Sequence, residues 1–237
     1  MHLDRDAVVA TWRALGLGDR PPVLEVPDHG ATLSARDAAD HAALCGLRAR
    51  GLARTGPHGI PVPIADLADA LRVLDRPEVT VDLRSWEPEA RGWYAAVAGE
   101  LVVVVEAGPD HAWTLDVAAR PPADPVSALA LLVLARLPDE PPLPGVAMTV
   151  PPDVLFAGAS ARRLPPAVGT RLESLRSEPP RRRLQLGATL HPSRRRVGPV
   201  TAVDSVDGRA LVEIDDDTVR VRPADRAAIA RALSRSA

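Results

Sequence analysis

The segment Val219-Arg220-Val221-Arg222-Pro223-Ala224-Asp225 decides the fold, because it ends a run of expected strands and begins the terminal helix at residues 226–236. Pro223 has no backbone N–H to donate to a strand ladder, and its ring fixes φ for a turn. Asp225 stands where the first turn of a helix needs an oxygen acceptor for its free N–H groups. The segment therefore predicts a strand, a corner and an amphipathic helix in that order.

The same order of features occurs once earlier in the chain. There Arg120-Pro121-Pro122-Ala123-Asp124 leads into an apolar helix at residues 125–137. The expected strands before the two corners are 94–97, 101–106 and 113–117, beginning near Val79, and 197–203, 210–214 and 219–221, beginning near Leu184. The repeat predicts an α+β fold, a pseudo-two-fold-symmetric body with a central, largely antiparallel sheet flanked by helices.

The repeat also predicts how the chain is divided. Its 237 residues are enough for one large domain with a shared core. We expect a single domain, 1–237, made of two similar halves at about 1–137 and 145–237. The Pro-rich stretch 138–144 would join them as a linker.

Composition bounds the partners and the compartment. Aromatic residues make up only 3% of the chain, so the core must be built from Ala, Val and Leu. All 29 basic residues are Arg, and the formal net charge of −2 gives no field that would attract nucleic acid or an anionic membrane. The single Cys45 excludes an internal disulfide and is typical of a reducing cytosol.

Neither the first residues nor the apolar runs of the chain predict a signal peptide or a membrane span. Residues 1–6 carry acids where a signal peptide has a basic region followed by an apolar one. The longest apolar runs, 101–105 and 128–135, are far shorter than the ~20 residues that span a bilayer. We expect a cytoplasmic protein with no membrane partner.

No constellation of residues predicts catalysis. His41 and Cys45 have the i, i+4 spacing of metal ligands, but the chain offers no second pair to complete a site. Gly16 and Gly18 follow an expected helix and not a strand, which is the wrong context for a phosphate loop. Asp28 and His29 lie together in a loop with no nucleophile near them in sequence. We therefore expect no enzyme, no metal and no cofactor.

Two basic features leave alternatives open. The runs 181–183 and 194–196 are all Arg and would flank one strand, where they either meet an acidic patch on a partner or discourage edge-to-edge pairing. The segment 36–55 resembles the helix of a winged helix-turn-helix, so a DNA-binding regulator is the alternative function. The same residues also fit a plain helix that ends at Gly51.

Several segments together resemble one family. They are Pro22-Val23-Leu24-Glu25-Val26-Pro27-Asp28-His29-Gly30-Ala31-Thr32, Leu47-Arg48-Ala49-Arg50-Gly51-Leu52, Arg76-Pro77-Glu78-Val79-Thr80-Val81-Asp82-Leu83-Arg84, Asp207-Gly208-Arg209-Ala210-Leu211, and the 219–225 segment. In the first of these, residues 22–27 read as a short strand closed by prolines, and the rest opens an Ala-rich helix. The chain resembles the EspG family, the ESX (type VII) secretion-associated chaperones of actinobacteria.

The resemblance implies a cytosolic, non-enzymatic chaperone. Such a protein binds the helical tip of a PPE-type secretion substrate, usually in a PE–PPE pair, keeps it soluble and delivers it for export. The partner would lie against the central sheet and the C-terminal helices, through a contact with an apolar centre and a charged rim. The resemblance and the position of the strands give these candidate contact residues: Trp93, Leu101, Val103, Trp113, Arg195, Arg196, Arg209 and Glu213. We expect no nucleic-acid partner, and a homodimer of the free chain stays open.

Overall fold

The computed structural model describes residues 1–86, 89–108, 110–156, 165, 168–169, 173, 179–215 and 217–237. Its helical segments are α1 (Arg5–Ala14), η1 (Pro22–Leu24), α2 (Leu33–Ala49), η2 (Pro57–Gly59), α3 (Ala65–Asp75), α4 (Pro125–Leu134), α5 (Pro152–Phe156) and α7 (Arg226–Arg235). Its strands are β1 (His2–Leu3), β2 (Ala53–Thr55), β3 (Pro61–Pro63), β4 (Val79–Trp86), β5 (Arg91–Ala98), β6 (Leu101–Ala107), β7 (Trp113–Ala119), β8 (Met148–Val150), β9 (Arg182–Leu190), β10 (Arg195–Ser205), β11 (Gly208–Asp215) and β12 (Thr218–Pro223).

Ten of these strands form one antiparallel sheet in the order β1-β7-β6-β5-β4-β9-β10-β11-β12-β8. We call β4–β7 with α4 the first half-sheet and β9–β12 with α7 the second. The two meet at the antiparallel pair β4–β9, and the strand order runs outward identically from that pair. Short strands close both edges, β1 beside β7 and β8 beside β12. The predicted fold, an antiparallel sheet flanked by helices with pseudo-two-fold order, is confirmed.

Both corners form as their sequences predict. Asp124 precedes α4, and its carboxylate accepts a hydrogen bond from the Ser127 backbone N–H at 2.8 Å. Asp225 precedes α7 and accepts from the Ala228 N–H at 2.6 Å. Each carboxylate satisfies a donor that the first turn of a helix would leave free. The two helices therefore start at equivalent places after β7 and β12.

One face of the sheet is covered at its centre by α4 and α7. Inward side chains of β4, β5, β9 and β10 alternate with outward ones and pack against both helices. Fully buried residues of this layer include Leu83, Leu186, Leu129 and Leu233. Because the helices lie over the junction of the half-sheets, one hydrophobic core spans both.

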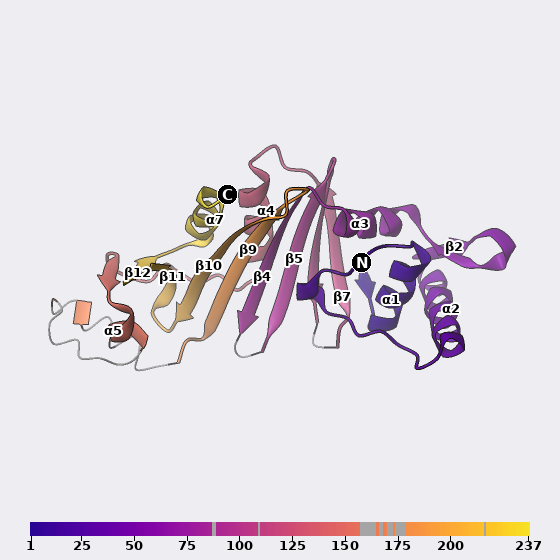
Figure 1. Ribbon diagram of the computed structural model, residues 1–237, viewed down its shortest axis with the longest axis horizontal. Helices are drawn as coiled ribbons and strands as arrows, with labels where there is room; N and C mark the ends of the chain where they lie inside the picture. Colours follow the sequence, from indigo (N-terminus) through magenta and orange to yellow (C-terminus); the bar gives the residue numbers. More distant parts are fainter. Residues whose placement is uncertain are drawn as a thin grey trace.

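Within the part of the chain that the structure describes, the second face is covered only toward its ends. Helices α1 to α3 pack over β5 to β7, with Trp12 and Trp113 edge to face at a centroid distance of 5.9 Å. At the other end a smaller cluster gathers around Met148, Val150 and Val219. Figure 1 shows α1 to α3 at one end of the sheet and α5 at the other, with β5, β4, β9 and β10 between them.

The structure corrects one expectation from the sequence and leaves two others untested. Residues 22–27 form no strand, because the prolines at both ends remove ladder donors and Pro22–Leu24 turns as a 3-10 helix against β5. The division into halves 1–137 and 145–237, with linker 138–144, stays a prediction. The sequence also predicts a helix at 164–175, and that stretch lies mostly outside the described residues.

Candidate functional site

The outward side chains at the centre of the second face form a surface that we call the open strip. Alternation fixes its members, because their neighbours along each strand point into the α4–α7 core. It consists of Thr80, Asp82, Arg84 and Trp86 on β4, Gln185, Gly187 and Thr189 on β9, and Arg196 on β10. Arg84, Trp86, Gln185 and Arg196 are exposed, whereas Thr80 and Gly187 are buried at the floor.

An ion pair crosses the junction of the half-sheets in this strip. Arg196 on β10 reaches over β9 and donates from both terminal nitrogens to Asp82 on β4, with Nη2 3.0 Å from Oδ2. Arg196 Nη1 also donates to the Thr189 hydroxyl at 3.2 Å. Gly187 lies directly opposite Asp82, and a Cβ there would collide with the guanidinium. Glycine at 187 therefore permits the crossing.

Two titratable groups border this ion pair. Burial raises the pKa of Tyr94 to about 12, although a hydrogen bond from Thr80 opposes the rise, so the phenol keeps its proton at neutral pH. Burial lowers the pKa of His191, and the charge of Arg194 adds to that effect. Both groups are therefore neutral near pH 7, and the guanidinium and carboxylate groups carry the charge of the strip.

Four of the candidate contact residues are buried. Trp93 belongs to the core beneath α4, while Val103 and Trp113 belong to the core beneath α1 to α3. Arg209 is fully buried against Asp204. These side chains cannot touch a partner in this structure, because helices cover the first three and Arg209 is enclosed by Asp204 and the segment 138–143.

The other four candidates reach the surface in different places. Arg196 lies in the open strip, whereas the neighbouring Arg195 points to the opposite side of β10. Glu213 lies on the same side of β11 as the core residue Leu211, and it pairs with Arg222 at 3.2 Å. Leu101 packs partly against the N-terminal helices. Alternation showed which side chains share a face, but the covered regions depend on distant helices.

Sequence reasoning missed Arg84 and Trp86. Arg84 ends the 76–84 segment quoted for the family resemblance, and Trp86 lies two residues after it. Both are on β4 and point to the same side as Asp82. The period-two pattern could have found them once the α4 side was known to be the core. Arg84 forms no ion pair with any residue that the structure describes.

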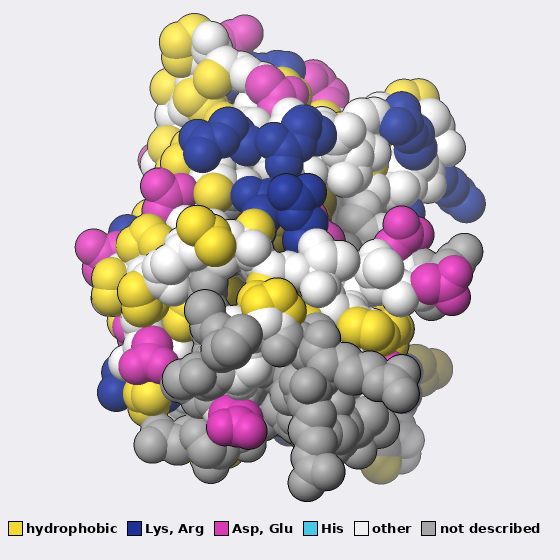
Figure 2. All heavy atoms as spheres, turned by 90° about the vertical axis from the view of Figure 1, so that its left-hand side faces the viewer, with side chains coloured by type: hydrophobic (Ala, Val, Ile, Leu, Met, Phe, Trp, Pro, Cys, Tyr) yellow, Lys and Arg dark blue, Asp and Glu magenta, His cyan; other side chains and the backbone are white. Residues whose placement is uncertain are grey.

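Arginine side chains also gather at one end of the molecule. Figure 2 views the end where β8 and β12 lie, and Arg groups cluster in its upper half. On β12, Arg220 is exposed and Arg222 is half-buried, and the cross-strand Glu213 neutralises part of this charge. This end therefore mixes charges of both signs along its strands.

A buried charge network supports the second half-sheet. The Asp204 carboxylate accepts from Arg209 Nε at 2.6 Å and Nη2 at 2.9 Å, and from Arg182 Nη1 at 2.9 Å. Asp204 and Arg209 are both fully buried. This buried carboxylate on β10 is paired with two guanidinium groups, and the pairs connect β10 with the start of β9 and with β11.

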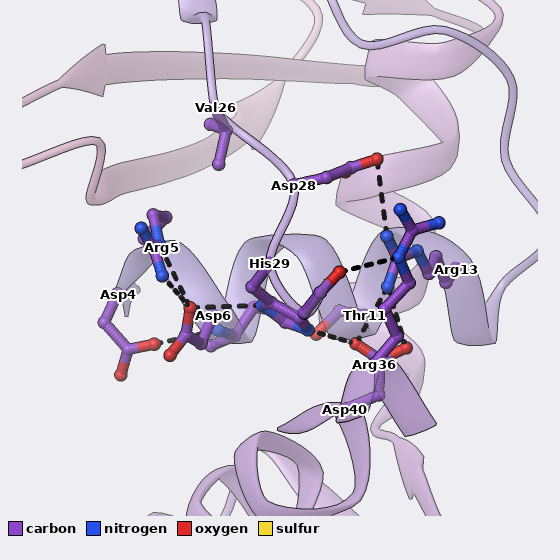
Figure 3. Close-up of polar contacts among 12 residues, drawn as sticks. Asp4, Arg5, Asp6, Thr11, Arg13, Val26, Asp28, His29, Arg36 and Asp40 are labelled. Carbon is purple, nitrogen blue, oxygen red and sulfur yellow. Dashed lines mark hydrogen bonds and ion pairs between the residues drawn. The ribbon is translucent and has the colours of Figure 1, made fainter. Parts of the chain in front are cut away.

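The predicted Asp28–His29 pair belongs to a network that ties α1 to α2. His29 is nearly buried, with Nδ1 3.1 Å from Asp6 Oδ1 and Nε2 2.7 Å from Asp40 Oδ1. Figure 3 shows the imidazole between these two carboxylates, with Arg13 bridging Asp28 and Asp40. Every group in the cluster is engaged by a neighbour from another helix or loop, which indicates a structural role.

The segment 36–55 comprises most of α2 and the strand β2. β2 pairs with β3 as a separate two-stranded sheet, so a hairpin does follow the helix. Arg48, Arg50 and Arg54 are exposed there, and Arg50 donates to the His2 carbonyl at 3.1 Å. His41 and Cys45 lie one turn apart on α2, with Nε2 3.6 Å from Sγ. No cluster of three metal-ligating side chains occurs among the described residues.

A comparison with models of protein families identifies the family of this chain. A family model described as the EspG family matches residues 4–235. The chain belongs to the EspG family. No protein among those with curated descriptions matched the sequence. The family match spans both half-sheets, the N-terminal helices and the segment 36–55.

One solved structure has the same fold as this chain. It is the Mycobacterium tuberculosis type VII secretion system chaperone EspG5 in complex with a PE25–PPE41 dimer, and it matches with a TM-score of 0.72. Sequence identity is 15%, and the match covers 100% of this chain and 95% of that one. At this identity the likeness establishes the fold alone. No helix within the described residues is both long and apolar enough to cross a membrane.

Proposed function

We propose that this EspG-family chain is a cytosolic, non-enzymatic chaperone of a type VII secretion system. It binds the helical tip of a PPE-type substrate, alone or in a PE–PPE pair, keeps it soluble and delivers it for export. The family match over residues 4–235 carries the proposal. The structural match to EspG5, which was solved with PE25–PPE41, supports it.

The partner contact is proposed to lie on the open strip, which is on the face of the sheet opposite α7, so the placement departs from the C-terminal helices that the resemblance implies. An exposed indole is available there, since Trp86 ends the outward row of β4 and borders a hollow that Pro22 and Val23 also line. Buried aromatic side chains commonly dominate binding energy, surrounded by polar groups that exclude water. Trp86 and Val23 would thus form the apolar centre, with Arg196 on the charged rim. Leu101 stays a predicted contact farther out on this face, whereas Arg195 and Glu213 lie on the α4–α7 side of the sheet and stay predictions that this placement does not use.

The direct test is co-expression with the PPE-type protein encoded nearest to this chain's gene, together with its PE partner where one exists. We expect a soluble complex with one copy of each chain on size-exclusion chromatography with light scattering. The proposal fails if the PPE-type protein stays insoluble and never co-elutes.

Two substitutions localise the contact. Trp86→Asp should abolish co-elution and leave the melting temperature of the free chain within a few degrees, because the side chain is exposed. The matched control is Leu131→Asp on α4, an equally exposed position on the opposite face, which should still bind. Reversing Arg196 should weaken binding by about 1 kcal/mol or less, as is usual for an exposed pair.

A DNA-binding regulator is the alternative that the helix and hairpin at 36–55 left open. The family match includes this segment, and the formal net charge of −2 gives no general attraction to DNA. We expect no retention on heparin at physiological salt. Strong, salt-dependent retention together with a failure to bind any PPE-type protein would favour the regulator.

A further inference from the structure

A polar pocket opens on the strip beside the ion pair that joins the half-sheets. Its volume is about 380 Å³, and η1 forms one of its walls. Its polar lining comes from Thr80, Asp82 and Arg84 on β4, Tyr94 on β5, Thr189 on β9, His191 just after β9 and Arg196 on β10. Three hydroxyl groups and two guanidinium groups therefore surround a space large enough for one side chain of a partner.

The charges of this lining do not cancel. Asp82 is the one carboxylate in the lining, and Arg196 already neutralises it through two hydrogen bonds. Arg84 adds a second positive charge and has no carboxylate partner among the described residues. Because Tyr94 and His191 are neutral near pH 7, the pocket carries a net charge of about +1.

The free donors suit a carboxylate. A guanidinium offers several N–H groups in a planar fork that matches both oxygens of a carboxylate, and such hydrogen bonds are about twice as strong as neutral ones. An apolar side chain in the same pocket would remove Arg84 from water without a counter-ion, which is unfavourable. A cationic side chain would add like charge beside two arginines.

We propose that this pocket receives an Asp or Glu side chain of the PPE-type partner, with Arg84 as its counter-ion. The inference rests on the proposed function, and it adds the chemistry by which the chaperone selects its substrate. The apolar contact at Trp86 would hold any helical tip, whereas the pocket discriminates in favour of a tip with a correctly placed acid. Complementary charge of this kind contributes mainly to specificity and to the rate of association.

The test measures the dissociation constant of the PPE-type protein, with its PE partner where present, for wild type, Arg84→Gln and Arg84→Glu. We expect Arg84→Gln to weaken binding about fivefold and Arg84→Glu at least about tenfold, mostly through slower association. Raising the salt concentration should weaken wild type more than Arg84→Gln. The control Arg231→Glu makes the same charge change at an exposed position on α7 and should alter binding less than about twofold.

A charge exchange identifies the acid on the partner. Each Asp or Glu of the PPE-type tip is changed to Arg, and one such variant should bind Arg84→Glu better than it binds wild type. If wild type binds tightly and Arg84→Glu binds equally well, this inference is wrong and the proposed function stands. If wild type fails to bind at all, both are wrong. Unchanged melting temperatures would show that lost binding is not lost folding.

Discussion

The two half-sheets share one strand order but differ in how their second faces are covered. Over the first, three helices bury Trp113, Val103 and Val105 in an extended core. Over the second, a smaller cluster around Met148 and Val219 covers the outer strands with fewer apolar side chains among the described residues. The difference leaves the strands at the junction without cover from any described helix, and that is where the open strip lies.

The half-sheets also differ in how their strands are held. The first is held almost wholly by apolar packing, which includes Trp93 and Trp113, whereas the second places the Asp204–Arg209 pair in its interior. β10 carries an irregularity between Val197 and Val200, around Gly198 at φ +91°. A bulge bends and twists a strand. Half-sheets with the same strand order are therefore held together by different interactions.

The largest expected effect breaks the buried pair of the second half-sheet. Asp204→Asn leaves Arg209 and Arg182 without their shared carboxylate, so it should lower the free energy of unfolding by about 3–5 kcal/mol in a urea titration. Asp217→Asn, an exposed change in the neighbouring hairpin, should shift it by less than about 0.5 kcal/mol. A loss under 1 kcal/mol for Asp204→Asn would mean that the Asp204–Arg209 pair does not stabilise the fold.

The shared core beneath α4 and α7 can be tested symmetrically. Leu129→Ala and Leu233→Ala each remove one fully buried leucine, the first from α4 and the second from α7, and each should cost about 2–5 kcal/mol. Both variants should unfold in one urea transition when followed by circular dichroism and by Trp fluorescence. Separate transitions for the two probes would show that the half-sheets unfold independently.

The crossing ion pair gives a smaller effect that sharpens the comparison. Gly187→Ala should displace Arg196 from Asp82 and cost about 1 kcal/mol, the worth of a partly exposed bidentate pair. In an Arg196→Ala background the same change should be neutral or slightly stabilising, because alanine suits a strand better than glycine. Additive losses in this double-mutant cycle would show that Gly187 serves another purpose.

The smallest effects concern the two helix caps. Asp124→Ala and Asp225→Ala should each cost about 1 kcal/mol. Burial alone would raise the pKa of Asp124, but hydrogen bonds from the Ser127 N–H and Ser234 hydroxyl outweigh it and hold the pKa below its ordinary value. Its stabilisation is therefore present above the unfolded pKa and is lost as pH falls through the folded one. Urea titrations at pH 7 and pH 3 should show the difference between wild type and Asp124→Ala shrinking at pH 3.

The sequence predicted the strands and corners because they depend on local chemistry. Pro223 and Asp225 act within a few residues, and period-two alternation is a property of each strand by itself. The open strip could not be predicted, because the exposure of Arg84 or Trp93 depends on where α4 and α1 lie. The Arg196–Asp82 pair joins residues 114 positions apart, and only the β4–β9 register brings them together.

The central claim is that a PPE-type substrate lies on the open strip at the junction of the half-sheets. A photo-crosslinking amino acid placed at Gln185 would report contact on the strip, and the same group at Arg231 on α7 would report contact on the opposite face. After irradiation of the co-purified complex, we predict a crosslinked band with the PPE-type protein from position 185 and none from position 231. Crosslinking from 231 alone would contradict the account.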